Sequence, residues 1–234
     1  EIFPRIIRHG KMLRNFAQVI RSGVLGRKSF GSRPKKCIQQ FLQSRTSVEL
    51  LRLTIGNKPT LADIIKMVHP KPQSLEQKAM FGWIVGKPYE IGFLPDVVQE
   101  YIRSCDGTGP VTDRMLTSLP HRLLTKHELG ENEWRTIALN SGWTAKRMNL
   151  NSYAKHGIFS GDLGRWTADQ IANAISDPEA VRRSKCFPYQ LLTAFQNIND
   201  DVPASIYRAL QDAMEVAIEN VPTISGGLAV LVDT

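Results

Sequence analysis

The feature that most constrains the fold is a helical spacing of apolar residues, which recurs in short stretches through most of the chain. The longest stretch runs from Ala204 to Asn220 and brings Ile206, Leu210 and Met214 to one face of a helix. About eleven such stretches follow one another, nearly all short, with turns between them. Short helices joined by brief turns predict an all-α fold, an α-solenoid of HEAT-like helical hairpins. Such repeats are degenerate enough to hide a sequence period, and no clean period is visible.

Capping residues mark several of the expected helix starts. Thr60 and Asp63 have the spacing of a capping box, and Ser47 can cap a short helix that follows it. Ser74 is expected to begin a further helix, and Pro34 suits the first turn of another. These residues place the predicted helices along the N-terminal half of the chain.

The tail of the sequence is the exception to the helical pattern. Residues 228–232 form a short, continuous apolar run that predicts a buried strand, like the first strand of a parallel sheet. A domain boundary is expected near 222–227, which gives a helical module over 1–221 and a linker with one strand of a truncated α/β domain over 222–234. The sequence begins at Glu1 and stops within the apolar run, so we expect it to be a piece of a longer protein.

The charges are segregated along the chain. Residues 1–71 carry 15 Lys and Arg against 3 Asp and Glu, whereas residues 72–234 carry 15 against 19. This asymmetry predicts a polyanionic partner. Nucleic acid is favoured over an anionic membrane, because no segment combines the apolar face and the basic face of an interfacial helix.

The densest group of cations lies between residues 21 and 36, where three glycines and no acid accompany it. Gly23, Gly26 and Gly31 allow backbone conformations that present amide groups to an anion, and phosphate is the expected ligand. The alternative is a solvated basic loop without a ligand. The candidate phosphate-binding residues of this segment are Arg21, Arg27, Lys28, Arg33, Lys35 and Lys36.

A second basic group, Arg182, Arg183 and Lys185, precedes the aromatic residues Phe187 and Tyr189. Cations beside exposed rings suit single-stranded RNA, whose bases stack while the cations hold phosphates. The alternative is the basic end of a helix with both rings in the core.

A third polar stretch also carries cations. It includes Trp143, Lys146, Arg147, Asn149 and Asn151, of which Arg147 and Asn149 are candidate RNA-binding residues. The asparagines could equally be helix caps.

No catalytic motif is visible. The five histidines lack metal-binding spacing, and residues 82–87 lack the spacing and the hydroxyl residue of a phosphate-binding loop. We therefore expect no enzyme, although a Cys/His pair formed by tertiary contact stays open. The three cysteines are far apart and fit a reducing compartment. No secretory leader or membrane-spanning run is present, so a soluble, cytoplasmic protein is expected.

Several stretches together resemble the TROVE module of the Ro autoantigen family, ring-shaped HEAT-repeat proteins that bind small noncoding RNAs. The likeness spans nearly the whole chain. Residues 30–38 resemble the family's W-G-R-x-x-R-K-A-[IV] element, with Phe30 for Trp, and residues 63–72 resemble its D-L-L-R-L-x-H-x-K-P element. Further similarities lie in residues 123–127 with 133–134, in residues 145–150 and in residues 187–189.

The resemblance implies a noncatalytic RNA-binding protein of ribonucleoproteins and RNA quality control. Its implied partners are Y-RNA-like hairpins on a basic outer face, single-stranded ends of defective or misfolded RNAs, and an exoribonuclease or other RNA-processing proteins. A protein-binding α-solenoid scaffold without RNA is the alternative. The positions that match or adjoin the family's motifs are Arg33, Lys35, Lys36, Lys58, Lys66, His69 and Lys71.

The tail resembles the first strand of a von Willebrand factor A domain, which follows the TROVE module in this family. By this resemblance Asp233 is the first carboxylate of a metal site that holds Mg²⁺ in a complete domain. One carboxylate supplies too few ligands, so the site is expected to be incomplete in this chain, which then has no cofactor of its own.

Overall fold

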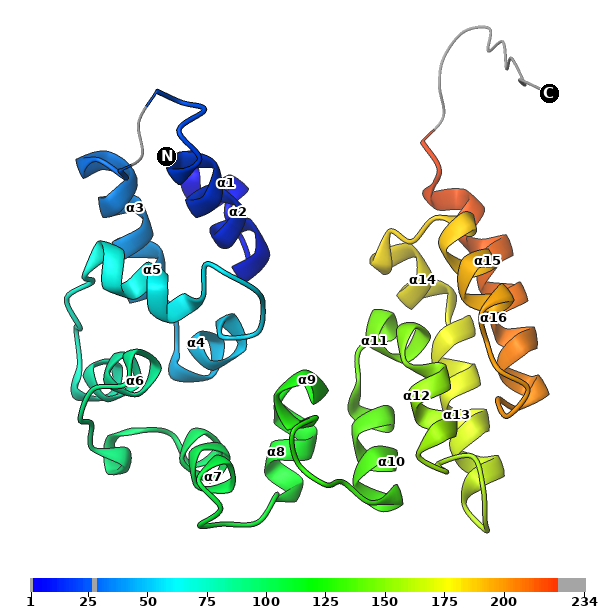
Figure 1. Ribbon diagram of the computed structural model, residues 1–234. Coiled ribbons are helices and arrows are strands. Elements are labelled where there is room, and N and C mark those ends of the chain that lie inside the picture. Colours follow the sequence, from blue (N-terminus) through cyan, green and yellow to red (C-terminus); the bar gives the residue numbers. More distant parts are fainter. Residues whose placement is uncertain (1, 27–28, 223–234) are drawn as a thin grey trace, which may run out of the picture. The chain divides into compact units, whose positions relative to one another are not determined.

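The structure is a computed structural model that describes residues 2–26 and 29–222 (Figure 1). The chain divides into two compact units, which we call unit 1 (residues 1–128) and unit 2 (residues 129–234). All regular elements of the described residues are helices, which confirms the predicted all-α, solenoid-like fold. The predicted strand at 228–232 lies outside the described residues, and the domain boundary expected near 222–227 stays a prediction.

Unit 1 consists of short helices, which pack on helices one to three places away along the chain. Contacts join α5 to α3 and α6, α4 to α6 and α7, and α7 to α8. Among the described residues its elements are α1 (Phe3–Ile6), α2 (Gly10–Arg21), α3 (Ser32–Gln43), α4 (Ser47–Leu53), α5 (Leu61–Val68), α6 (Leu75–Val85), the 3-10 helix η1 (Ile91–Phe93), α7 (Asp96–Cys105), α8 (Asp113–Ser118) and α9 (His121–Leu124).

The helix starts of unit 1 follow the predicted caps, with one shift. Thr60 and Asp63 form the capping box of α5, as predicted. At α4 the cap is Thr46, one residue before the expected Ser47, and Glu49 completes the capping box. Ser47 is buried and donates a hydrogen bond to Glu76 of α6, with 2.6 Å between the oxygens.

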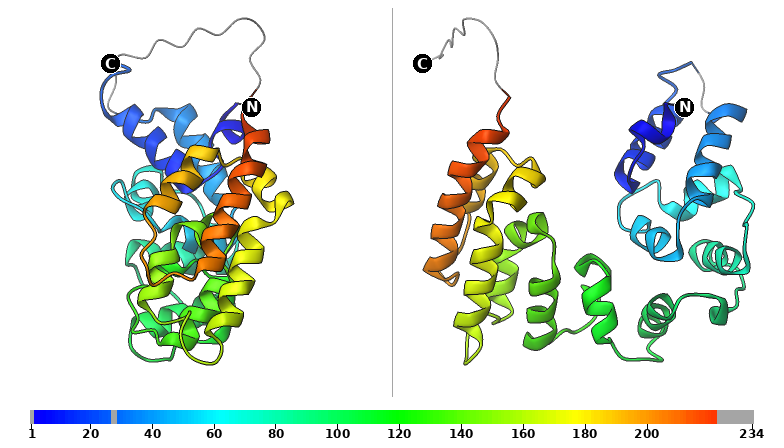
Figure 2. Two further views of the ribbon diagram at one scale, coloured as in Figure 1. Left: turned by 90° about the vertical axis from the view of Figure 1, so that its right-hand side faces the viewer. Right: turned by 180° about the vertical axis from the view of Figure 1, so that it is seen from behind.

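In unit 2 one long helix, α16, packs against α13, α14 and α15 (Figure 2). The core of unit 2 includes Tyr153, Ile171 and Leu210, none of which is exposed. The elements among the described residues are α10 (Glu131–Asn140), α11 (Trp143–Met148), α12 (Leu150–Lys155), α13 (Gly164–Ser176), α14 (Pro178–Ser184), α15 (Pro188–Gln196), α16 (Ala204–Ala217) and η2 (Ile218–Asn220).

The structure has more helices than the eleven expected, since its described residues contain sixteen α-helices and two 3-10 helices. The additional helices are short. Helices α1 and α9 have four residues each, which is little more than one turn and too short to repeat an apolar stripe. No helix among the described residues is long and apolar enough to cross a membrane.

Candidate nucleic-acid interface

Both carboxylates among residues 2–71 are engaged at helix starts. Glu49 Oε2 accepts a hydrogen bond from the backbone N–H of Thr46 at 2.9 Å, and Asp63 Oδ2 accepts one from the backbone N–H of Thr60 at 2.8 Å. These bonds are the main reason why the pKa of each carboxyl lies below its ordinary value. The acids of this stretch therefore neutralise helix N-termini, and among the described residues only Glu49 pairs with a cation, Arg45, at 3.3 Å.

Three arginines of unit 1 make contacts within the protein that stabilise its fold. Arg14 donates to the carbonyl oxygens of Leu53, the last residue of α4, at 3.1 Å and of Ile55, just after this helix, at 2.7 Å. Arg45 lies over the ring of Phe41, and Arg52 donates to the carbonyl oxygen of Ser118 at 2.9 Å. Because their guanidinium groups already have partners, these side chains are poor candidates for phosphate contacts.

The structure brings Arg21 and Lys58 together, although 37 positions separate them in the sequence. Both line a cleft of about 530 Å³ beside the end of α2 and the start of α5. Gln18 holds the two segments together, since its Nε2 donates to the carbonyl oxygen of Lys58 at 2.9 Å. The carboxylate in the cleft is Asp63, which is bonded to Thr60. The two cations thus face one solvent-filled space suited to a phosphate.

The first turn of α3 presents Arg33, Lys35 and Lys36. Gly31 precedes the helix with φ of 64°, in the region that favours glycine, and no side chain caps the first turn. Arg33 and Lys36 are exposed and Lys35 is half-buried. The helix begins at Ser32, so Pro34 lies in the first turn as predicted. An uncapped helix start with three cations and no acid attracts an anion.

Two glutamines of α3 join this helix to the segment after α5. Gln39 Nε2 donates to the carbonyl oxygen of Val68 at 2.6 Å, and Gln43 Nε2 donates to that of Lys71 at 2.7 Å. His69 lies between these anchors with φ of 50°, and its side chain is exposed. Lys66, one turn before His69, is also exposed, and both line a cavity of about 360 Å³.

Eight predicted residues therefore lie on the adjoining elements α2, α3 and α5 and on the loops beside them. We call this set the basic surface: Arg21, Arg33, Lys35, Lys36, Lys58, Lys66, His69 and Lys71. Within residues 2–26 and 29–222, none of its seven Lys and Arg residues forms an ion pair. Arg27, Lys28 and Asp233 lie outside the described residues, so their predicted roles stay predictions.

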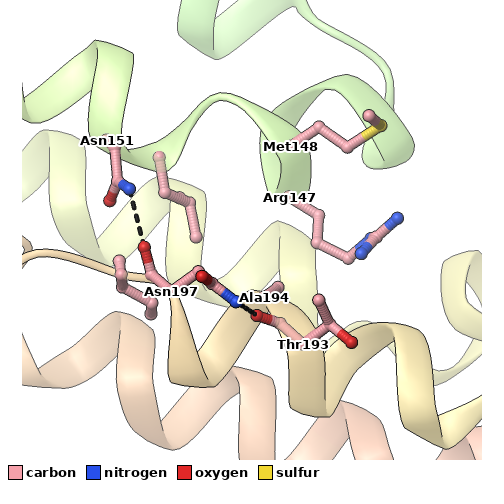
Figure 3. A pocket seen from close by; sticks show the side chains of 8 residues that line it. Arg147, Met148, Asn151, Thr193, Ala194 and Asn197 are labelled. Atoms are coloured by element: carbon pink, nitrogen blue, oxygen red, sulfur yellow. Dashed lines mark hydrogen bonds between the residues drawn. The ribbon is translucent and has the colours of Figure 1, made fainter.

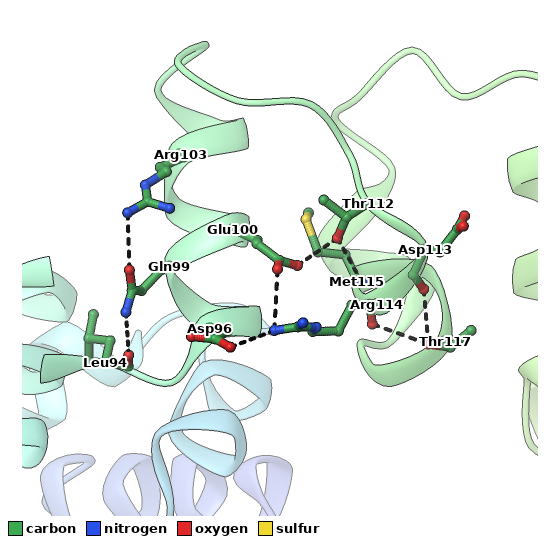
Figure 4. A network of polar contacts seen from close by, with 10 residues as sticks. All are labelled: Leu94, Asp96, Gln99, Glu100, Arg103, Thr112, Asp113, Arg114, Met115 and Thr117. Carbon is green, nitrogen blue, oxygen red and sulfur yellow. Dashed lines mark hydrogen bonds and ion pairs between the residues drawn. The ribbon is translucent and has the colours of Figure 1, made fainter. Parts of the chain in front are cut away.

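The later part of unit 1 shows the opposite pattern, because a cation there is surrounded by carboxylates (Figure 4). Arg114 of α8 lies 2.8 Å from Asp96 and 3.4 Å from Glu100, both on α7. Thr112, the N-cap of α8, donates to Glu100 at 2.6 Å. This network joins α7 to α8 and compensates the charge of Arg114.

In unit 2 the second basic group is divided. Arg182 donates two hydrogen bonds to Glu219, at 2.7 and 3.1 Å, and one to Glu179 at 3.0 Å, and these bonds raise its pKa above the ordinary value. Its charge is compensated, which weighs against the predicted RNA contact. Arg183 and Lys185 are exposed and have no ion pair among the described residues.

The two aromatic rings beside this group differ in exposure, so one fits the predicted stacking on a base and the other fits the alternative of packing in the core. Phe187 is half-buried, whereas the side chain of Tyr189 is 64% exposed. The rings stack at 6.2 Å between centroids. One exposed ring, on which a base can stack, therefore lies within a few positions in the sequence of two exposed cations that can hold phosphates.

The third polar stretch is largely structural. Asn149 Nδ2 donates to the carbonyl oxygen of Ala145 at 2.6 Å, which is the capping role left open above. Lys146 is buried, its Nζ donates to the carbonyl oxygens of Leu139 and Ser141, and burial lowers its pKa. Its role is therefore to donate hydrogen bonds to carbonyl oxygens at the C-terminal end of α10.

Arg147 has a mixed role. Its Nη1 donates to the carbonyl oxygen of Gln190 at 2.7 Å, and its Nε is buried without a hydrogen-bond partner. It lines a cavity of about 380 Å³ together with Met148, Asn151 and Thr193 (Figure 3). Asn151 Nδ2 donates to the carbonyl oxygen of Asn197 at 2.7 Å, so much of the polar lining is already bonded within the protein.

Sequence reasoning missed two cations, Lys78 and Lys87. Both line the 360 Å³ cavity that also includes Lys66 and His69. Lys78 belongs to α6 and Lys87 to the turn after it, and both are exposed. The signal available in the sequence was Gly86 followed by Lys87 and Pro88, a helix end that turns back on itself.

Titratable side chains also gather near the end of α7, where Lys126 Nζ lies 4.9 Å from the ring centroid of Tyr101. No group of three or more His, Cys, Asp or Glu residues in the part of the chain that the structure describes could hold a metal ion. Cys37, Cys105 and Cys186 are free thiols. His127 Nε2 lies 3.4 Å from Ser104 Oγ, and this hydroxyl also donates to the carbonyl oxygen of Tyr101 at 2.8 Å.

Comparisons with solved structures show a likeness in fold. Neither a protein-family model nor a curated protein matches the sequence. Among solved structures, the crystal structure of the Ro (RSR) protein of Deinococcus radiodurans matches with a TM-score of 0.68 and 19% sequence identity. The match covers 94% of this chain and 47% of that one, so the chain spans about half the length of the Ro structure. At this identity the likeness shows a shared fold.

Proposed function

We propose that this chain is a noncatalytic RNA-binding protein whose basic surface holds the phosphates of small structured RNAs. The observation that supports the proposal is the excess of positive over negative side chains on α2, α3 and α5 and the loops beside them. Seven Lys and Arg residues there have no ion pair among the described residues, while Glu49 and Asp63 are bonded at helix starts. An excess of cations that the fold does not neutralise favours a polyanion.

The arrangement favours RNA over an anionic protein or membrane. The cations occupy separate places, a cleft beside α2, the uncapped start of α3 and the segment after α5. Cations at several separate places can each contact a different phosphate of one RNA backbone. Support also comes from the Ro-like fold and from the sequence elements that resemble the TROVE module. Arg183, Lys185 and the exposed Tyr189 are proposed as a second, weaker contact in unit 2.

The resemblance to the TROVE module also suggests which RNAs and which protein partners this chain binds. We propose binding of Y-RNA-like hairpins and of single-stranded ends of defective RNAs in cytoplasmic ribonucleoproteins, with RNA-processing proteins such as an exoribonuclease as partners. Asp233 and Mg²⁺ enter this proposal only through a complete von Willebrand A-like domain.

The salt dependence of binding tests the proposal. Affinity for a labelled RNA hairpin is measured by fluorescence anisotropy between low and moderate salt. The logarithm of the association constant is expected to fall linearly with the logarithm of salt concentration, by about 0.7 to 0.9 units for each phosphate neutralised. Binding that does not change with salt, or no binding at all, contradicts the proposal and favours a protein-binding scaffold.

A further inference from the structure

Two cavities of unit 1 lie side by side along α6 and share two residues, Lys78 and Pro88. The first, cavity A, has a volume of about 360 Å³ and includes Lys66 and Lys87. The second, cavity B, has a volume of about 510 Å³ and includes Phe93. Both volumes fall within the range of sites for small ligands. One lysine and one proline thus separate two spaces of similar size.

Backbone geometry at the end of α6 builds this pair of cavities. Gly86 ends the helix with φ of 74°, and the N–H of Lys87 donates to the carbonyl oxygen of Gly82 at 2.9 Å. The chain then turns back along α6. A Cβ at Gly82 would lie 3.1 Å from Tyr89 Cβ and 3.2 Å from the Pro88 oxygen, so glycine permits this close approach. Pro88 is thereby held as the wall between the cavities.

Cavity A combines an apolar interior with cations. Ile65 and Phe81 are buried side chains that line it. Lys66, Lys78 and Lys87 are exposed, come from different elements, and have no ion pair among the described residues. An apolar ring that carries a phosphate fits this chemistry, because the ring can contact Phe81 while the lysines hold the anion.

Cavity B offers an aromatic platform and one acid. The side chain of Phe93 is 44% exposed, and the half-buried Tyr89 lines the same space. An exposed ring beside Lys78 is suited to stacking on a base. Glu90 is the acid in the lining, and it repels phosphate but accepts hydrogen bonds from an exocyclic amino group. A base with such a group therefore fits cavity B better than uracil.

We propose that cavities A and B hold two consecutive nucleotides of single-stranded RNA, with Lys78 at the phosphate that links them. This inference rests on the proposed RNA-binding function and adds a location and a base preference to it. The shared lysine is the reason to prefer a strand over two separate mononucleotides, since one cation can hold the single phosphate between neighbouring nucleosides. Cavity B selects cytosine, adenine or guanine over uracil through Glu90.

The test compares the affinities of the same set of protein variants for two RNAs. Fluorescence anisotropy gives the affinity for a single-stranded cytidine hexamer and for a blunt-ended RNA hairpin. The variants are Phe93→Ala and Lys78→Ala, and the control is Lys155→Ala, an exposed lysine of unit 2. Phe93→Ala is expected to weaken hexamer binding about 5-fold or more, as loss of one base–ring stack does, and to leave hairpin binding within about twofold. Lys78→Ala is expected to weaken hexamer binding, and the control to leave both unchanged.

A second comparison tests the base preference. Wild-type protein is expected to bind the cytidine hexamer more tightly than a uridine hexamer, and Glu90→Ala is expected to bring the two affinities together. If Phe93→Ala and Lys78→Ala bind the hexamer as the wild type does while hairpin binding persists, the inference is wrong and the proposed function stands. If the wild type binds neither RNA, both fail.

Discussion

The side-chain amide of Gln18 donates a hydrogen bond to the main-chain carbonyl oxygen of Lys58 at 2.9 Å, and this bond fixes the loop before α5 against the end of α2. Through it Arg21, three residues after Gln18, faces the same cleft as Lys58. Two cations from distant parts of the sequence thereby line one cleft.

This relationship predicts the effect of removing either cation. Arg21→Ala and Lys58→Ala are each expected to weaken hairpin binding several-fold and to lower the salt slope by about 1, because each removes one phosphate contact. If both bind the same phosphate, the double variant loses less than the sum of the two single effects. Anisotropy titrations at several salt concentrations check this, and full additivity places the two cations on separate phosphates.

Charge reversal at the start of α3 is the stronger test of the basic surface. The triple variant Arg33→Glu, Lys35→Glu and Lys36→Glu is expected to abolish hairpin binding. The melting temperature is expected to change little, because acids near a helix N-terminus are favourable and these side chains are not fully buried.

The matched control reverses three exposed cations of unit 2, Lys155, Arg165 and Arg208. It has the same change in net charge, so its binding is expected to stay close to that of the wild type. Equal losses in the two triple variants would show that only net charge matters and would contradict a specific role for α3. Unfolding of the α3 variant would show that this cluster supports the fold.

Local signals explain how much of the fold the sequence could predict. Thr60 and Asp63 form a capping box through contacts within one turn, so their spacing alone identifies the start of α5. Apolar stripes likewise locate the longer helices, because burial of one face repeats at a fixed period. The choice of Ser47 instead of Thr46 was off by one residue, because both side chains can cap and only the backbone conformation decides between them.

The candidate site depends on contacts that no local pattern records. Arg182 pairs with Glu219, 37 residues later, so a cation that looks free in the sequence is neutralised in the structure. Lys146 looks exposed in a polar stretch, yet its amine reaches two carbonyl oxygens at the C-terminal end of α10. Lys78 lines the same cavity as Lys66 only because α6 packs on α5. In each case tertiary packing decides whether a charge is available.

Lys146 is predicted to matter for stability and not for RNA binding. Lys146→Met keeps the length of the side chain but leaves the carbonyl oxygens of Leu139 and Ser141 without this donor. We expect a loss of about 1–3 kcal/mol in the free energy of unfolding, the usual cost of an unsatisfied buried polar group. Urea denaturation measures it, and hairpin affinity under folding conditions is expected to be unchanged. Unaltered stability with weaker binding would assign the amine to the RNA.

The stability of unit 2 is predicted to depend on the protonation of His156. Its ring stacks on Trp134 at 4.1 Å between centroids, and burial, aided by the nearby Lys155, lowers its pKa below the ordinary value of about 6.5. The unfolded chain therefore binds a proton more readily than the folded one. The stabilisation is fully present above the unfolded pKa and is lost as the pH falls through the folded pKa.

His156→Phe separates this effect from that of the other histidines. Phenylalanine can keep the stack on Trp134 but does not titrate, so the variant is expected to lose less stability than the wild type between pH 7.5 and pH 5.5. His121 and His127, whose pKa values burial also lowers, belong to unit 1 and contribute to both proteins, so they cancel in the comparison. Urea denaturation followed by tryptophan fluorescence reports on unit 2, which holds three of the four tryptophans. An equal pH dependence in the two proteins would show that His156 has the same pKa in the folded and unfolded chain.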